Sequence, residues 1–188
     1  VSYSYRPVLV LSFMAQESLF GFDPMWAHLV NVLLYALCCY LAFLFFREIL
    51  PKDKFQIAFV GALLFTIHPI HNEVVNNIKS RDEILMLCFG LGAILTGLYA
   101  VRKEKHLPLA GFFLLGLMAA YSKDNGAILI AFTPVILAFQ GKRESIGSYL
   151  IILLASVILL LRIPLYHLPT RVYLAMGYIL LMVLGLNL

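Results

Sequence analysis

Charged residues are scarce in this chain of 188 residues, at 13% against 62% hydrophobic residues. An ordinary soluble domain carries about a quarter charged residues, so the shortage argues against a soluble protein. Cysteine is scarce too, and Cys38, Cys39 and Cys88 all lie inside apolar stretches. That placement predicts small core residues, without the spacing of a disulfide framework or a zinc site.

The chain has long charge-free windows instead. No Asp, Glu, Lys or Arg occurs at residues 24–46, 55–72, 84–101, 106–122, 125–141, 145–161 and 172–188. Each window is about long enough to cross roughly 30 Å of hydrocarbon as a helix. Because lipid cannot satisfy backbone polar groups, we predict an all-α polytopic transmembrane bundle of about seven spans, in one domain at residues 24–188.

Residues 1–23 form a separate segment in this interpretation. Pro7 suits the first turn of a helix, residues 8–20 are mostly apolar, and Gly21 and Pro24 mark a break. We expect a short helix here that lies along the outer membrane surface.

Short connections make the helices alternate in direction. Residues 1–23, 73–83, 123–124 and 162–171 then share one side, and 47–54, 102–105 and 142–144 share the other. The second side carries the whole formal charge of +4, which makes it cytoplasmic by the positive-inside rule. We therefore expect an integral, multi-pass membrane protein, with the lipid bilayer as a partner and no nucleic-acid partner.

Polar residues gather on the outer side, most densely in HPIHNEVVNNIKSRDE at 68–83. Pro69 should bend or end a helix there, and Ser80 with Glu83 matches a capping box. The cations on this side could clamp a phosphate; they are Arg6, Lys79, Arg81 and Lys123. Glu73 and Asp82 are carboxylates available for acid–base work.

Each of these functional interpretations has a structural alternative. Arg81 and Asp82 could serve only a helix cap and an ion pair, Lys123 and Asp124 could form an ordinary turn, and His28 and Asn31 could be interhelical hydrogen bonders. A second set, His68, His71 and Glu73, could hold a divalent metal ion. Their spacing is not a specific ligand signature, so we expect no metal and no other cofactor.

Four motifs in order resemble one known family. They are YRP at 5–7, GFDPMWAHLVNVLLYAL at 21–37, HPIHNEVVNNIKSRDE at 68–83 and YSKDN at 121–125. Together they are similar to the transmembrane and tetratricopeptide-repeat glycosyltransferases, GT-C-type enzymes whose animal members are protein O-mannosyltransferases. The resemblance runs from about Tyr3 to Pro134. It implies transfer of a sugar from a polyprenyl-phosphate donor to an acceptor hydroxyl, on a protein or a glycan, at the outer face.

The resemblance also implies roles for residues at the motif positions. Arg81 and Lys123, with Arg6 and Lys79 beside them, would bind the lipid phosphate, and Glu73 and Asp82 would shape or polarise the sugar–acceptor pocket. The expected site-shaping residues are His28, Asn31, His68, His71 and Asp124. At position 124 the chain departs from the family, which usually has Glu there.

We expect the chain to be a piece of a longer protein. The family's main catalytic acid lies in the first outer loop, upstream of Val1, and the first span, the start of that loop and the C-terminal repeat domain are expected outside this chain. Alone it should therefore be inactive. The wording of the third motif favours a bacterial inner membrane with the site facing the periplasm, or a luminal site in the endoplasmic reticulum if the protein is eukaryotic.

Two other functions stay open from the sequence. A lipid-linked solute transporter or flippase would need polar residues through the membrane midplane, whereas here they cluster at one face. A structural membrane scaffold would use the outer motifs only to cap and pair helices.

Overall fold

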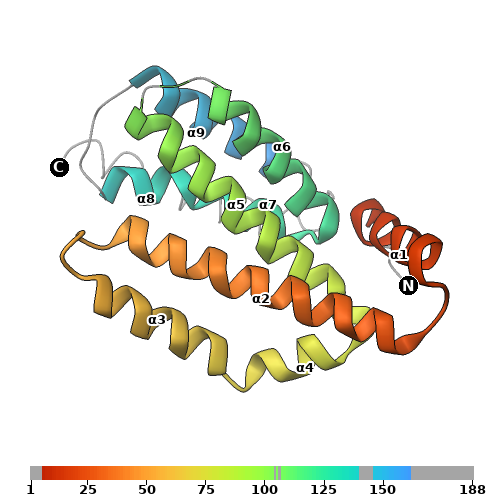
Figure 1. The fold of residues 1–188 in the computed structure, drawn as a ribbon. Coiled ribbons are helices and arrows are strands. Elements are labelled where there is room, and N and C mark those ends of the chain that lie inside the picture. Colours follow the sequence, from red (N-terminus) through yellow and green to blue (C-terminus); the bar gives the residue numbers. More distant parts are fainter. Residues whose placement is uncertain (1–5, 104, 106, 140–145, 162–188) are drawn as a thin grey trace.

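The computed structural model describes residues 6–103, 105, 107–139 and 146–161, and within these ranges every regular element is a helix (Figure 1). In chain order the elements are α1 (Pro7–Phe20), α2 (Pro24–Ile49), α3 (Phe55–Ile67), α4 (Ile70–Asn76), the single 3-10 turn η1 (Ile78–Ser80), α5 (Arg81–Lys103), α6 (Leu107–Ser122), α7 (Asn125–Ala131), α8 (Thr133–Phe139) and α9 (Ile146–Leu161). The all-α prediction is confirmed for this part of the chain.

Among the described helices, two are long and apolar enough to cross a membrane by length and composition. They are the segments Pro24–Ile49 and Ile78–Lys103. The bent pair α3 and α4 makes a third candidate if it is counted as one span. Helices α6 to α9 fall in further charge-free windows but are shorter, and the window 172–188 lies outside the described residues, as do 142–144 and 162–171.

Prolines account for two breaks in the helical pattern. As predicted, Pro69 separates α3 from α4, and the two helices meet at 58°. The predicted helix at 125–141 is interrupted at Phe132, between α7 and α8. Pro134 has no N–H to donate to the carbonyl of Ile130, which weakens the helix at this turn.

The N-terminal helix begins and ends where the sequence predicts. Pro7 occupies its first turn, and Gly21 ends it with a positive φ of 71°, a conformation that glycine adopts without strain. Asp23 then caps α2, because its Oδ1 accepts a hydrogen bond of 2.8 Å from the backbone N–H of Met25. That α1 lies along a membrane surface stays a prediction.

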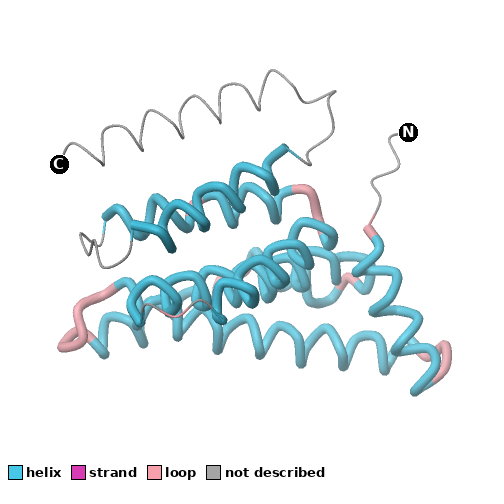
Figure 2. The backbone as a smooth tube through the Cα atoms, turned by 90° about the horizontal axis from the view of Figure 1, so that it is seen from above, coloured by secondary structure: helices cyan, strands magenta, loops and turns pink. Residues whose placement is uncertain are grey.

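Helix α5 is the centre of the bundle and packs against both α2 and α6 (Figures 1 and 2). Its inward positions are small or aliphatic, and Ala93, Leu98 and Ala100 are completely buried. Phe112 of α6 fills the space beside Gly97. Small residues let helices approach closely, which is the packing that membrane bundles favour.

Ion pairs tie the helix ends together at both ends of the bundle. At one end the C-terminal turns of α2 and α5 are joined by Glu48 and Arg102. At the other end Asp82, at the start of α5, pairs with Arg6. The described loops therefore group into the two sets that alternating helix directions predict.

The packing of α2 on α5 brings two cysteines together. The Sγ atoms of Cys38 and Cys88 are 2.7 Å apart, and each also lies 3.3–3.4 Å from a backbone carbonyl of the other helix. Both thiols are free and buried, as small core residues should be.

We predict that mild oxidation of the full-length protein links Cys38 to Cys88, because a disulfide of about 2.05 Å needs only a small movement from this separation. Mass spectrometry of peptides under non-reducing conditions measures the link. Cys39→Ser should keep it and Cys88→Ser should remove it. A link that depends on Cys39 would contradict this packing.

Candidate functional site

The described parts of the four sequence motifs meet at one end of the bundle. Helix α1 lies beside the beginnings of α2 and α5 (Figure 1), and the α6–α7 turn reaches the same end. We call this region the motif end; it comprises residues 6–31, 68–83 and 121–126.

Arg81, the first residue of α5, is the most enclosed side chain there, with no exposed surface. Its Nε donates to Oδ1 of Asn31 at 2.8 Å. Its Nη2 donates to Oε1 of Gln16 at 2.6 Å and to the carbonyl of Ala27 at 3.0 Å. The guanidinium lies 4.2 Å from the centre of the Phe13 ring. One side chain thus joins α1, α2 and α5.

The hydrogen-bond acceptors of Arg81 are all neutral, so no carboxylate offsets its buried charge. Losing any one of them should therefore lower the stability of the folded protein. Removing a charge from water costs several kcal/mol, and hydrogen bonds to a charged group each return about 1.5–3 kcal/mol. Stacking on Phe13 adds roughly 0.5–2 kcal/mol. One nitrogen of Arg81, Nη1, is buried without a hydrogen-bond partner, so two of the five guanidinium N–H groups are left without an acceptor.

The carboxylate next to Arg81 points elsewhere. Asp82 is 3% exposed and forms an ion pair with Arg6, at the entrance to α1. Its other oxygen accepts the backbone N–H of Glu83 at 3.0 Å. Asp82 thus forms an ion pair, as the structural alternative allows, whereas Arg81 has neutral partners.

Lys123 meets α5 from the α6–α7 turn. Its Nζ lies 2.5 Å from Oε1 of Glu83, so Glu83 reaches across to another helix rather than back to Ser80 as a capping box requires. The turn is tight, since a Cβ on Gly126 would lie 2.3 Å from the carbonyl oxygen of Ala119. Asp124 holds the N-cap position of α7 but makes no side-chain cap hydrogen bond.

The turn before α5 is built by Asn77. Its Oδ1 accepts the backbone N–H of Lys79 at 3.1 Å, which starts η1. Its carbonyl accepts from the Nδ2 of Asn31 at 3.4 Å. Asn31 therefore bridges the turn to Arg81, which confirms it as an interhelical hydrogen bonder.

Two histidines lie at the bend between α3 and α4. The His71 ring packs 4.5 Å from Phe65 and 5.5 Å from Tyr35, between centroids, and 5.9 Å from His68. Glu73, in the first turn of α4, is exposed. Within the described ranges no group of three His, Cys, Asp or Glu side chains comes together as a metal site would require.

The candidate site residues differ in how exposed their side chains are to solvent. Arg81, Asp82 and Asn31 are buried, while Arg6, Lys123, Asp124 and His28 are partly exposed, and Lys79, Glu73 and His68 are exposed. A phosphate outside the protein can meet Arg6, Lys79 and Lys123 directly. The role of Arg81 in phosphate binding stays a prediction, because its guanidinium is enclosed in this structure.

Gln16, Phe13 and Glu83 also belong to this site, although the sequence did not single them out as site residues. Gln16 is one of the few polar residues in an apolar helix, and it is 9% exposed. A lone amide on an apolar segment could have indicated a buried partner. Phe13 and Glu83 carry no such signal.

The chain matches the family model described as dolichyl-phosphate-mannose-protein mannosyltransferase over residues 7–167. The chain belongs to this mannosyltransferase family. The resemblance stated from the four motifs is thereby confirmed.

Two protein O-mannosyl-transferases are similar to this chain over most of its length. Protein O-mannosyl-transferase F38B6.6 of Caenorhabditis elegans is 31% identical over 159 residues, 81% of this chain and 22% of that protein. Protein O-mannosyl-transferase TMTC2 of Homo sapiens is 34% identical over 152 residues, 78% of this chain and 18% of that protein. The chain thus spans about a fifth of these relatives' length. No solved structure gives a significant match.

We predict that Arg81→Ala lowers the free energy of unfolding by about 3 kcal/mol or more, because it leaves the oxygens of Gln16 and Asn31 buried without a donor. Lys79→Ala is the matched control: it removes an exposed cation two residues away and should change stability by about 0.5 kcal/mol or less. Unfolding of the full-length protein in detergent compares them. Equal stability of the two variants would contradict the clamp.

Proposed function

We propose that the full-length protein transfers mannose from a polyprenyl-phosphate donor to an acceptor hydroxyl, on a protein or a glycan. The family match over residues 7–167 carries this proposal. The names of the relatives support it, since they are protein O-mannosyl-transferases. In the reaction the acceptor oxygen forms a bond to C1 of the sugar, the bond from C1 to the phosphate oxygen breaks, and polyprenyl phosphate leaves.

The accessible cations of the motif end are suited to the donor phosphate. Arg6 and Lys123 are partly exposed, and each is held by a carboxylate of α5, Asp82 or Glu83. Lys79 is exposed in η1, directly before α5. Arg supplies a planar fork and Lys a point charge, and both would offset the charge that develops on the leaving phosphate.

The two carboxylates have different tasks in this proposal. Asp82 is buried and paired with Arg6, so it would hold Arg6 in place for the donor. Glu73 is exposed at the start of α4 and can polarise the acceptor. The acceptor hydroxyl gives up its proton to a general base of the full-length protein. Within the motif end, the site-shaping residues would be His28, Asn31, His68, His71 and Asp124.

The membrane arrangement follows from the charge asymmetry. The bundle has about seven spans of GT-C type, with loops 47–54 and 102–105 in the cytoplasm and the motif end on the outer side. That side is the periplasm for a bacterial inner membrane or the lumen for the endoplasmic reticulum. The polyprenyl chain would lie along the apolar helices, with its phosphate at the membrane surface.

A scaffold function is the second candidate, because the buried Arg81 joins three helices as a purely structural clamp would. The two functions differ in the effect of the accessible cations. A scaffold needs the Arg81 cluster for folding, but it has no use for donor binding by Lys123.

We predict that the full-length protein in liposomes transfers radiolabelled mannose from dolichyl phosphate mannose to serine- and threonine-containing peptides. Lys123→Ala should raise the KM for the donor roughly tenfold or more, because a charge-assisted contact to phosphate is lost. Lys105→Ala, an exposed lysine at the opposite end, should leave the KM unchanged.

If the unaltered protein transfers mannose and Lys123→Ala leaves the KM for the donor unchanged, the assignment of Lys123 to the donor phosphate is contradicted. A folded, full-length protein that consumes no donor with any acceptor would contradict the enzyme proposal and favour the scaffold.

A further inference from the structure

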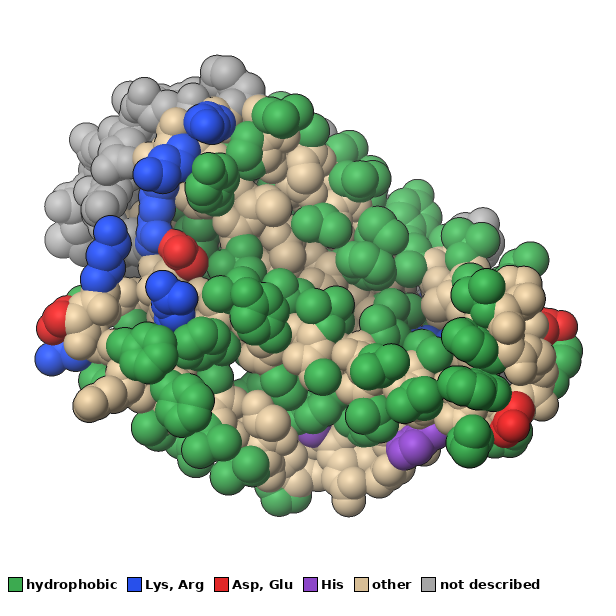
Figure 3. Space-filling model, in the orientation of Figure 1, with side chains coloured by type: hydrophobic (Ala, Val, Ile, Leu, Met, Phe, Trp, Pro, Cys, Tyr) green, Lys and Arg blue, Asp and Glu red, His purple; other side chains and the backbone are tan. Residues whose placement is uncertain are grey.

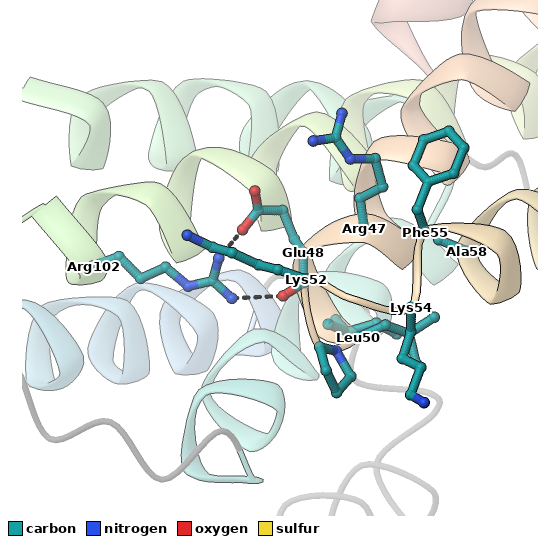
Figure 4. A pocket seen from close by; sticks show the side chains of 10 residues that line it. Arg47, Glu48, Leu50, Lys52, Lys54, Phe55, Ala58 and Arg102 are labelled. Atoms are coloured by element: carbon teal, nitrogen blue, oxygen red, sulfur yellow. Dashed lines mark hydrogen bonds and ion pairs between the residues drawn. The ribbon is translucent and has the colours of Figure 1, made fainter.

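A cavity of about 720 Å³ lies at the end of the bundle opposite Arg81 (Figure 4). It is formed where α2 ends, α3 begins and the last turn of α5 comes beside them. Its lining is Arg47, Glu48, Ile49, Leu50, Pro51, Lys52, Lys54, Phe55, Ala58 and Arg102. The volume is within the range of small-molecule sites, roughly 300–1,000 Å³.

The charge of this lining is strongly positive. It holds four cations and a single carboxylate, and that carboxylate, Glu48, is already paired with Arg102. Arg102 also donates from Nη2 to the carbonyl of Glu48 at 2.6 Å, so this corner is fixed. Lys54 has only a weak neighbour, Asp53, at 3.6 Å and largely exposed. Figure 3 shows Lys and Arg gathered at this end.

The backbone adds to the attraction for an anion. Helix α3 begins at Phe55, directly at the cavity, and its N-cap residue Lys54 makes no side-chain cap hydrogen bond. The first N–H groups of a helix have no partner within the helix and favour negative charge. The cavity thus combines lysine and arginine side chains with the positive end of a helix.

An apolar surface leads away from the cavity along α3. Phe55 and Ala58 line the cavity, and the outward side of α3 is mostly apolar and exposed for the rest of its length. Its exposed large hydrophobic residues beyond Phe55 are Ile57, Phe59, Val60, Leu63, Leu64 and Ile67, while Gln56 and Thr66 are exposed polar residues of the same helix. Helix α3 packs chiefly on α2 and forms the edge of the bundle (Figure 1). Acyl chains can lie along this side while a headgroup occupies the cavity.

We propose that this cavity binds the phosphate-bearing headgroup of an anionic membrane phospholipid, with its cationic lining supplying the attraction for the phosphate. Charge complementarity and the continuity between the cationic cavity and the apolar side of α3 both select a lipid. A soluble phosphate has the same charge but no use for the apolar surface. The site is separate from the motif end, so its test requires no transfer activity.

Native mass spectrometry of the full-length protein in detergent provides the test, with phosphatidylglycerol as the probe. Phosphatidylcholine with the same acyl chains carries no net charge and serves as one comparison, and inorganic phosphate serves as the soluble one. Lys52→Ala/Lys54→Ala removes two lining cations. The matched control, Lys103→Ala/Lys105→Ala, removes two exposed lysines at the same end that do not line the cavity.

We expect phosphatidylglycerol to bind more tightly than phosphatidylcholine, and the lining variant to lose affinity for it roughly tenfold or more, while the control variant does not. Equal losses in the two variants would mean general attraction to this end and would overturn the site. Equal binding of the two lipids would overturn it as well. Displacement of the lipid by millimolar inorganic phosphate would assign the cavity to a soluble anion instead.

Discussion

The buried guanidinium of Arg81 is the constraint on which the motif end depends. A charge with no exposed surface is tolerable only where acceptors surround it, and here they come from three separate segments. Gln16 holds α1, Asn31 and Ala27 hold α2, and Arg81 itself begins α5. The position of α1 over the end of the bundle follows from this cluster together with the Arg6–Asp82 ion pair, which holds the start of α1 against α5.

The same cluster decides which charges remain available. Because Arg81 takes neutral acceptors, Asp82 is left to hold Arg6, and Glu83 is left to hold Lys123. Each pair keeps a cation at the rim, partly exposed, with a carboxylate of α5 behind it. At the other end of the bundle Glu48 and Arg102 satisfy each other, while the remaining cations surround a cavity. The two ends thus differ in chemistry: one presents mixed charges and the other presents cations.

Local signals in the sequence were sufficient for the helices but not for their contacts. Pro7, Gly21 and Pro69 act on their own backbone, so the bounds of α1 and the bend after α3 could be predicted from them. The partner of Glu83 depends on where the α6–α7 turn lies in space, and so local spacing suggested Ser80 instead of Lys123. Burial of Arg81 by Gln16 is likewise a contact between residues 65 positions apart, which no pattern within one helix specifies.

The central claim is that the motif end receives the donor phosphate. The most direct test is photo-crosslinking of the full-length protein with a polyprenyl-phosphate analogue that carries a diazirine next to the phosphate. Peptide mapping should find the label in residues 6–20, 77–83 and 121–126, and excess unlabelled donor should remove it. Label confined to residues 47–58 and 102–105, at the opposite end, would contradict the account.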